Sequence, residues 1–509
     1  MCQLNVFSLL CAVYVLNAVR ADLRFASYYG SHMVLQKAPE QAVLWGYGSN
    51  EYKVTVFLVG ELEFHSQVVD VQNGTWRVTL PPQTAGGPYN VTAIQQDAQV
   101  TLTDLLFGDV WLCGGQSNMA FPLSQVFNAS AEKAQAAKYP DVRIFMAALE
   151  LSQEELIDLR KVQMPWSVPS ADLVGNFSAV CWLFGRYLYK ILGYPVGLVE
   201  SCWGGTPVEA WSSTRALQKC GLDGLEMEDK RFFYIASLPN KYGPSPKREN
   251  SVLWNAMIHP FLNMTIKGAI WYQGEDNTAY HLDKYACSFP AMIDDWREAF
   301  HLGSGGQTAL DFPFGFVQLC TYNKSAESDS FPELRWHQTA DYGFSPNPRM
   351  KNTFMAVAVD LPDEKSPWGS IHPRDKQDVA YRLTLGARAV VYGEKGVAFQ
   401  GPFPVNVLLK GDLITVTYTQ AVSVAPSKSA FEICCTKEIN PCNSNSTWLP
   451  APIMQWGHSY VQVSTATCEN AVAGLRYAWR DWPCDFKACP VYSDDEELPA
   501  PPFTINRWP

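Results

Sequence analysis

The strongest indication of the fold is the sequence FGDVWLCGGQSNM at residues 107–119. Its first half, Phe107–Cys113, is a short, mostly apolar run, which is typical of a strand buried on both faces of a sheet. The second half changes at once to glycines and small polar residues around Ser117. Such a turn after a buried strand predicts the carboxyl end of a parallel strand, where open α/β sheets place their active sites.

The same pattern recurs along the chain. Further short apolar runs predict strands at 196–199, 266–271, 314–319 and 354–359. Apolar residues spaced about four apart predict helices at 178–192, 282–302 and 373–392. The first of these helices should end at Gly193, because a glycine and then a proline follow its last turn. Strands alternating with helices predict an α/β fold with an open, mainly parallel sheet over residues 104–395.

Both flanks of this segment are rich in short strands instead. Residues 22–103 contain alternating runs such as Trp76–Leu80, with turn signals at Asn73-Gly74 and around Pro88. Residues 396–509 contain similar runs, such as Leu413–Tyr418. We therefore expect a β-sandwich-like segment on each side of the α/β segment.

The composition describes a large, aromatic-rich globular chain. Of its 509 residues, 47% are hydrophobic and 17% are charged, which excludes a disordered, collagen-like or coiled-coil chain. The formal net charge is −11 and the chain has no basic run, so we expect no nucleic-acid partner.

The first 21 residues read as a secretory signal peptide. An apolar run over 6–16 precedes Val19-Arg20-Ala21, which has small residues at the positions a signal peptidase requires. The run is shorter than the roughly 20 residues of a membrane span, so we expect no stable membrane insertion. Cleavage after Ala21 removes Cys2 and Cys11 and leaves an even number of cysteines, which an oxidising compartment favours as disulfides.

Seven Asn-x-Ser/Thr sequons agree with secretion. They are Asn73, Asn90, Asn128, Asn176, Asn263, Asn323 and Asn445. Together with the leader they predict a glycoprotein of the secretory pathway that is lysosomal, secreted or both. The spacing of the cysteines does not give their pairing, and the oligomeric state cannot be read from the sequence.

Small and polar residues follow each predicted strand. Ser117 lies in a glycine-flanked turn that can expose its hydroxyl and direct its N–H toward an oxyanion, although a plain tight turn with a helix cap explains it equally well. Gly204 and Gly205 follow the strand at 196–199, and the amide of Gln273 follows the strand at 266–271. Either group can donate to an oxyanion, or simply hold its loop in place.

His372 follows the last predicted strand. Pro373 comes next, and we place it at the first position of the helix, which aims the imidazole at the sheet edge. A lone histidine is usually structural, but a histidine at the same edge as an exposed serine is a candidate general base.

In chain order, four blocks resemble those of the SGNH/GDSL hydrolase superfamily and, within it, those of the sialate O-acetylesterases. The blocks are GQSNM at 115–119, WGGTPVEAW at 203–211, WYQGE at 271–275 and SIHPRDK at 370–376. The resemblance implies an SGNH-type sheet with helices on both faces, with Ser117 as nucleophile and His372 as base. It also implies oxyanion donors from the Ser117 N–H, the N–H of Gly204 or Gly205, and the Gln273 amide.

The chain departs from the superfamily at one position. Many SGNH enzymes have an aspartate three residues before the histidine, where this chain has Gly369. The third member of a triad is then open between Asp360, Asp363 and Glu364, which are nearby in sequence. A dyad with a main-chain carbonyl that orients His372 is equally compatible with the sequence.

The resemblance implies a substrate as well: O-acetylated sialic acid, free or on glycans, acetylated at the 9-hydroxyl and possibly at others. The implied chemistry is covalent, through an acetyl-serine. Because this sugar is anionic, Arg335 is a candidate carboxylate clamp, with Gln338 and Trp203 as further contacts. An ordinary surface salt bridge explains Arg335 equally well.

Two other functions remain compatible with the sequence. One is an esterase for other acetylated glycans, such as plant or bacterial polysaccharides. The other is a catalytically inert carbohydrate-binding glycoprotein, which the joint presence of Ser117 and His372 disfavours. The eight histidines form no ligand-spaced cluster, so we expect neither a metal nor another cofactor.

Overall fold

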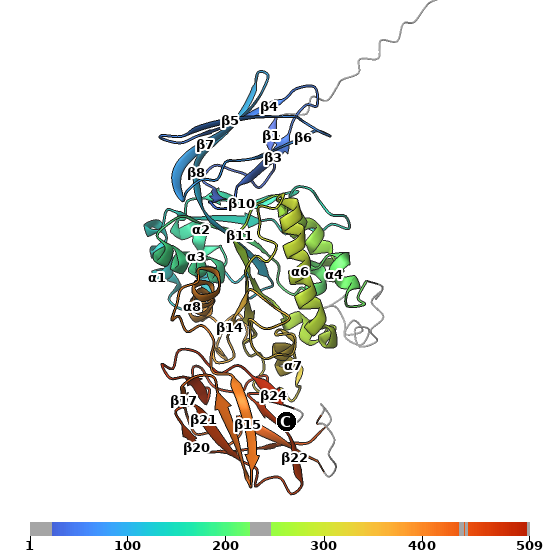
Figure 1. Cartoon of the computed structure of the whole chain (residues 1–509), viewed down its shortest axis with the longest axis vertical. Coiled ribbons are helices and arrows are strands. Elements are labelled where there is room, and N and C mark those ends of the chain that lie inside the picture. The colour runs from blue at the N-terminus through green and yellow to red at the C-terminus, as the bar shows by residue number, and fades with distance from the viewer. Residues whose placement is uncertain (1–22, 224–245, 437–441, 443–445, 506–509) are drawn as a thin grey trace, which may run out of the picture.

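The structure is a computed structural model that describes residues 23–223, 246–436, 442 and 446–505. The expected signal peptide and the sequon at Asn445 lie outside these residues. Three parts follow one another along the long axis of the molecule (Figure 1). An N-terminal β part is at one end, a central α/β part is in the middle and a C-terminal β part is at the other end.

One sheet organises the central part. In spatial order its strands are β10 (Val162–Ser167), β9 (Val142–Ala147), β11 (Val196–Cys202), β8 (Ala98–Gly115), β12 (Gly268–Tyr272), β13 (Phe314–Gln318) and β14 (Thr353–Val357). On this path only β10 and β9 pair antiparallel, and every other neighbouring pair is parallel. The expected mainly parallel sheet is therefore confirmed, and each apolar run predicted as a strand lies largely within it.

The strand order has its switch point at β8. The chain crosses from β8 to β9 and back to β11 on one side, then continues through β12, β13 and β14 on the other. The register places Cys202 of β11 and Tyr272 of β12 both opposite Gly115 at the end of β8. The segments after these three strands thus leave the sheet side by side, where open α/β sheets bind their ligands.

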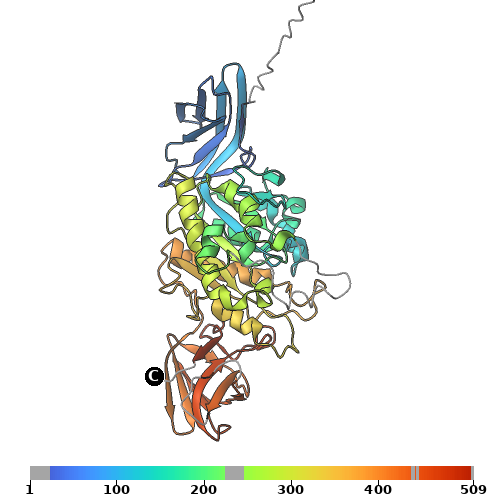
Figure 2. The same ribbon diagram turned by 90° about the vertical axis from the view of Figure 1, so that its right-hand side faces the viewer.

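The α-helices in the described ranges are α1 (Ala129–Ala134), α2 (Ala171–Gly175), α3 (Ala179–Leu192), α4 (Thr214–Gln218), α6 (Tyr285–Gly303), α7 (Ser330–His337) and α8 (Lys376–Gly386). α3 and α8 lie on one side of the sheet, and α4 and α6 lie on the other (Figures 1 and 2). α3 ends as expected, at Gly193 with φ 68°.

The start of α8 corrects one expectation. The helix begins at Lys376, and Pro373 lies before it. Asp375 is the N-cap, because its side chain accepts a hydrogen bond from the Asp378 N–H at 3.1 Å. The side-chain cap of Asp375, and not Pro373, thus determines where the helix begins.

The N-terminal part is joined to the central part by β8 itself. β4 (Val54–Val59), β5 (Phe64–Val69) and β7 (Gly86–Gln95) form an antiparallel sheet with the first half of β8, and β2 (Val34–Gln36) runs parallel to its middle. A second sheet contains β1 (Arg24–Phe25), β3 (Val43–Tyr47) and β6 (Thr75–Thr79). The expected boundary between residues 103 and 104 falls inside β8, and one hydrophobic cluster runs through both parts.

The C-terminal part has a hydrophobic cluster of its own. One antiparallel sheet contains β15 (Pro404–Lys410), β16 (Leu413–Tyr418), β21 (Tyr460–Ser464) and β20 (Ile453–Gly457). The other contains β19 (Trp448–Pro450), β18 (Phe431–Thr436), β22 (Ala471–Tyr477) and β24 (Phe503–Ile505). A short ladder pairs β17 (Val422–Val424) with β23 (Val491–Ser493). Side chains of both larger sheets share the cluster, as two packed sheets do.

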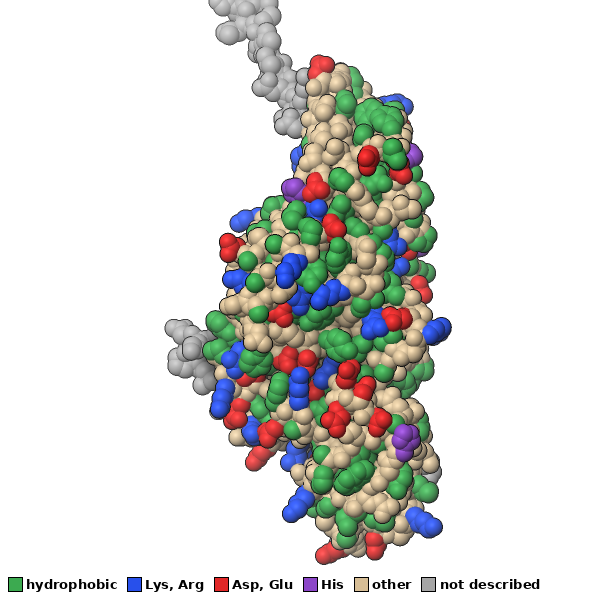
Figure 3. All heavy atoms as spheres, turned by 90° about the vertical axis from the view of Figure 1, so that its left-hand side faces the viewer, with side chains coloured by type: hydrophobic (Ala, Val, Ile, Leu, Met, Phe, Trp, Pro, Cys, Tyr) green, Lys and Arg blue, Asp and Glu red, His purple; other side chains and the backbone are tan. Residues whose placement is uncertain are grey.

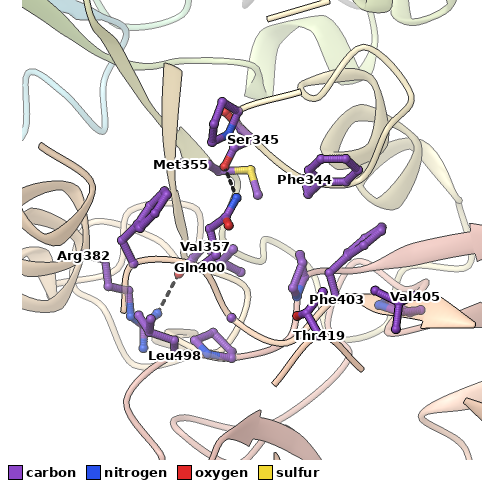
Figure 4. A pocket seen from close by; sticks show the side chains of 16 residues that line it. Phe344, Ser345, Met355, Val357, Arg382, Gln400, Phe403, Val405, Thr419 and Leu498 are labelled. Atoms are coloured by element: carbon purple, nitrogen blue, oxygen red, sulfur yellow. Dashed lines mark hydrogen bonds between the residues drawn. The ribbon is translucent and has the colours of Figure 1, made fainter. Parts of the chain in front are cut away.

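A cavity of about 350 Å³ lies where the C-terminal part meets β14 (Figure 4). Met355 and Val357 of β14 line it together with Phe344, Phe403 and Leu498. On the face that carries α8, acidic side chains gather near this junction (Figure 3). The contact between the central and C-terminal parts is therefore largely apolar and contains a cavity. Charged side chains lie at its edge.

Five disulfides cross-link the described residues. They join Cys113 to Cys181, Cys220 to Cys287, Cys434 to Cys442, Cys435 to Cys468 and Cys484 to Cys489. The expectation of disulfides is confirmed. Cys202 and Cys320 are free and buried.

Of the sequon asparagines in the described ranges, all but Asn263 are exposed. Asn263 is half-buried, and its side-chain oxygen accepts a hydrogen bond from Arg77. Among the described residues, no helix combines the length and the apolar character needed to cross a membrane.

Candidate active site

Ser117 and His372 meet at the carboxyl edge of the sheet. Ser117 lies two residues after β8 and is half-exposed, and His372 lies in the loop between β14 and α8. The Nε2 atom of His372 is 2.8 Å from the Ser117 Oγ, which is hydrogen-bond distance for proton transfer. The structure therefore brings together the two residues that the sequence singled out as nucleophile and base.

The other ring nitrogen of His372 bonds to a main-chain carbonyl. Its Nδ1 is 2.9 Å from the oxygen of Trp368, so the ring donates there in the tautomer that leaves Nε2 free to accept from Ser117. Gly369, between the two, has φ 87°, a conformation that favours glycine. Ser366 closes the loop, because its hydroxyl donates to the His372 carbonyl at 2.7 Å.

The candidate carboxylates of a triad are engaged elsewhere. Both oxygens of the buried Asp360 accept from Arg382, at 2.6 and 2.9 Å. Asp363 accepts from the guanidinium of Arg374, at 2.6 and 2.9 Å. Glu364 is exposed and lies 3.8 Å from the ammonium of a lysine. Of the alternatives left open by the sequence, the geometry favours the dyad with a main-chain carbonyl.

The surroundings of His372 keep its imidazole neutral. Burial lowers the pKa of His372 below its usual 6.5, and the nearby positive charge of Lys376 lowers this pKa further. The hydrogen bond to the Trp368 carbonyl acts in the opposite direction, and its influence on the pKa is smaller than that of burial but larger than that of Lys376. A neutral imidazole at neutral pH is the form that accepts a proton.

The oxyanion donors available next to Ser117 are main-chain N–H groups. A Cβ added to Gly204 would lie 3.1 Å from the Cβ of Ser117, which is tighter than an ordinary contact, so glycine lets the two segments come this close without crowding. Within the described part of the chain, the N–H groups of Ser117, Gly204 and Gly205 donate to no protein acceptor. Such unused donors beside a nucleophile are what an oxyanion requires.

The expectation that Gln273 supplies an amide donor is wrong in this structure. Gln273 is fully buried, and its Nε2 donates to the Thr206 carbonyl at 3.1 Å and to Asn277 at 2.7 Å. Its side-chain oxygen accepts from Tyr285 at 2.9 Å. Since both N–H groups and the oxygen have partners, the side chain holds the loop after β12 in place.

A buried polar chain behind the nucleophile was missed by sequence reasoning. The side-chain oxygen of Asn118 accepts from the Lys376 ammonium at 2.7 Å, and its Nδ2 donates to Glu275 and to the Ile371 carbonyl. Burial lowers the pKa of Lys376 to about 8 and raises that of Glu275. Asn118 thus ties the turn of Ser117 to the loop of His372. All three residues lie in or next to the quoted blocks, but nothing in one sequence shows that they touch.

The interpretation of Arg335 as a carboxylate clamp is also wrong. Arg335 is fully buried in α7, and its guanidinium donates to the main-chain carbonyls of Leu319, Cys320, Arg480 and Asp481. Gln338 is equally buried and bonds to main-chain atoms of residues 273, 317 and 319. Both residues fasten α7 to the sheet and do not face a substrate. Trp203 is half-buried in the loop that carries Gly204.

Comparisons with known proteins agree with this site. A family model described as carbohydrate esterase, sialic acid-specific acetylesterase, matches residues 107–366, and one described as sialate O-acetylesterase C-terminal domain matches 405–507. The chain is 49% identical to the sialate O-acetylesterase of Rattus norvegicus, over 95% of this chain and 94% of the relative. This chain belongs to the sialate O-acetylesterase family. It is a hydrolytic esterase.

Other relatives extend the same likeness over the whole chain. The sialate O-acetylesterase of Homo sapiens is 48% identical over 94% of this chain and 92% of its own length. The crystal structure of a carbohydrate acetylesterase from Xanthomonas citri has a TM-score of 0.78 and 27% identity, and covers 95% of this chain and 100% of its own. The esterase thus shares its architecture with a carbohydrate-active relative across all three parts.

Proposed function

We propose that this esterase removes O-acetyl groups from sialic acids, including the 9-O-acetyl group, through a covalent acetyl-enzyme formed on Ser117. The observation that carries the proposal is the 2.8 Å contact between the Ser117 hydroxyl and the His372 imidazole, next to unused main-chain N–H groups. The names of the family models and relatives support the sugar.

The first half of the reaction acylates the serine. His372 takes the Ser117 proton on Nε2 while the serine oxygen attacks the acetyl carbonyl carbon. The carbonyl oxygen becomes an oxyanion that accepts hydrogen bonds from the N–H groups of Ser117 and Gly204. When the tetrahedral intermediate collapses, the C–O bond to the sugar breaks, and His372 returns the proton to the departing sugar oxygen.

The second half returns the enzyme to its starting state. Water enters, His372 takes one of its protons, and the resulting nucleophile attacks the acetyl-serine carbonyl. Collapse of this second intermediate releases acetate and restores the hydroxyl of Ser117. The Trp368 carbonyl accepts from Nδ1–H throughout, which steadies the imidazolium in both halves without a side-chain carboxylate.

The proposal is tested by the release of acetate from matched substrates. Wild-type protein is incubated with 9-O-acetylated sialic acid and, separately, with an acetylated xylan. We expect kcat/KM on the sialic acid to exceed kcat/KM on the xylan at least tenfold. Faster release from the xylan would assign the enzyme to neutral polysaccharides, and no release from either would contradict the proposal.

We also infer that the chain passes through the secretory pathway and acts in lysosomes, outside the cell or in both places. Five disulfides and the exposed sequon asparagines support this location. Protein made in animal cells should then gain mobility on a gel after enzymatic removal of N-glycans. Unchanged mobility would contradict the assignment.

A further inference from the structure

A substrate carboxylate needs a cation near Ser117, and Arg335 does not supply one. The guanidinium of Arg374 bonds to Asp363, and the ammonium of Lys376 is buried behind the nucleophile against Asn118. Lys247 is a different case. It is half-buried, next to the loop that follows β11.

Lys247 rests on three consecutive residues of this loop. Its ammonium donates to the carbonyl of Gly204 and lies 5.8 Å from the centre of the Trp203 ring. A Cβ added to Gly205 would be 3.4 Å from the Nζ of Lys247. Gly204 in turn packs against Ser117, so one glycine separates the nucleophile from the ammonium. The gap from the serine to the ammonium is then on the order of 5–9 Å, which one sugar ring with its substituents spans.

The charge of Lys247 has no carboxylate partner among the described residues. Asp276, whose negative charge acts on this ammonium, forms its ion pair with Arg248 instead. Partial burial lowers the pKa of Lys247, and the positive charge of Arg248 adds to this decrease. The other two N–H groups of the ammonium donate to no protein group in the described ranges. An anion at this position would therefore meet a charged donor that no carboxylate of the described residues neutralises.

We propose that Lys247 binds the carboxylate of the sialic acid, with Trp203 against the sugar, and so selects anionic acetylated sugars over neutral ones. This inference rests on the proposed function. In a sialic acid the carboxylate and the acetylated glycerol chain flank the ring oxygen on opposite sides. With the carboxylate at Lys247, the acetyl group on that chain extends across Gly204 toward Ser117.

The experiment compares 9-O-acetylated sialic acid with its methyl ester, which has the same shape but no charge. The measured quantity is the ratio of kcat/KM on the acid to kcat/KM on the methyl ester. Because both substrates pass the same loop, the ratio cancels any damage that a substitution does to Gly204. Lys247→Gln keeps a neutral donor for the Gly204 carbonyl and removes the charge. Lys247→Arg keeps the charge.

Lys247→Gln is expected to lower this ratio about ten- to a hundredfold, which is the usual worth of a charge-assisted hydrogen bond. Lys247→Arg should keep the ratio within about threefold of the wild type. A matched control is Lys351→Gln, the same charge change at an exposed lysine just before the amino end of β14. It should leave the ratio unchanged.

Equal losses on the acid and on the methyl ester in Lys247→Gln would overturn the inference, since the lysine would then only position the loop. A ratio that fell equally in Lys351→Gln would also overturn it, because the net charge would be the cause. Failure of the proposed function gives a different result. Wild-type enzyme would then release acetate from an aryl acetate but from neither form of the sialic acid.

Discussion

Two polar groups at the carboxyl edge of the sheet have opposite environments. Ser117 and His372 bond to each other, and the N–H groups beside the serine have no protein acceptor in the described residues. Arg335 in α7 and Gln338 directly after it have their donors taken by main-chain carbonyls of the neighbouring loops and strand. From residue type alone, both the first pair and the second pair of residues were candidates for the active site. The difference separates residues whose donors the fold has already used from Ser117 and His372, beside which main-chain donors are left for a substrate.

The largest effect is expected from substitutions of the first group, Ser117 and His372. His372→Ala should lower kcat/KM on the order of 10⁴-fold, because the serine then has no base. Adding Ser117→Ala to it should lower the rate little further, since the two residues act as one unit. The measurement is acetate release by each single variant and by the double variant. Losses that multiply in the double variant would show that the pair is not a unit.

A substitution of Arg335, in the second group, should instead lower the stability of the fold. Arg335→Met leaves four main-chain carbonyls without this donor and should lower the free energy of unfolding by about 4 kcal/mol, at roughly 1 kcal/mol for each. Denaturant unfolding measures this loss. The fraction that stays folded should bind 9-O-acetylated sialic acid with nearly the wild-type KM. A stable variant with a strongly raised KM would return Arg335 to the substrate site.

Substitution of Asp360 tests whether this carboxylate acts in catalysis or only stabilises the fold. Asp360→Asn removes the charge that faces the buried Arg382 and should cost about 3 kcal/mol of stability. The kcat of the folded variant should stay within about fivefold of the wild type, because His372 bonds to the Trp368 carbonyl. Asp363→Asn and Glu364→Gln should change kcat even less. A loss near 10⁴-fold in any of the three would identify a carboxylate of a triad.

The smallest effect concerns the pH profile. Kcat/KM should fall as the pH drops through the pKa of His372, because the protonated ring accepts no proton from Ser117. The Lys376 ammonium disfavours this protonation. Lys376→Met should therefore raise the pKa of His372 and move the acidic limb to higher pH, by less than about one unit. Glu275→Gln, in the same buried chain, removes a negative charge and should not move the limb upward.

Most of the central sheet could be predicted from the sequence because its buried strands are apolar on both faces and end in abrupt turns. The same rule brought Ser117 and His372 to one edge, since parallel strands share their carboxyl ends. Neither β9 nor β10 was predicted. The charged Arg143 interrupts the apolar run of β9, and the residues of β10 alternate between exposed and partly buried positions and include a proline, a weak strand signal.

The unpredicted parts of the site depend on atoms without a sequence signature. The partner of His372 is a main-chain carbonyl, which every residue has, and only the fold shows that the carbonyl of Trp368 reaches the ring. The burial of Arg335 and Gln273 depends on how distant segments pack, so the side-chain type gives no warning of it. Lys247 was overlooked because the residues around it in the sequence form no motif.

Acetate release by the Ser117→Ala variant tests whether Ser117 is the nucleophile. The variant lacks only a hydroxyl in a half-exposed turn, so its melting temperature should equal that of the wild type. At equal concentrations of folded protein, its kcat on 9-O-acetylated sialic acid should fall on the order of 10⁴-fold or more. A variant that retained turnover within about tenfold of the wild type would contradict the assignment of Ser117 as the nucleophile.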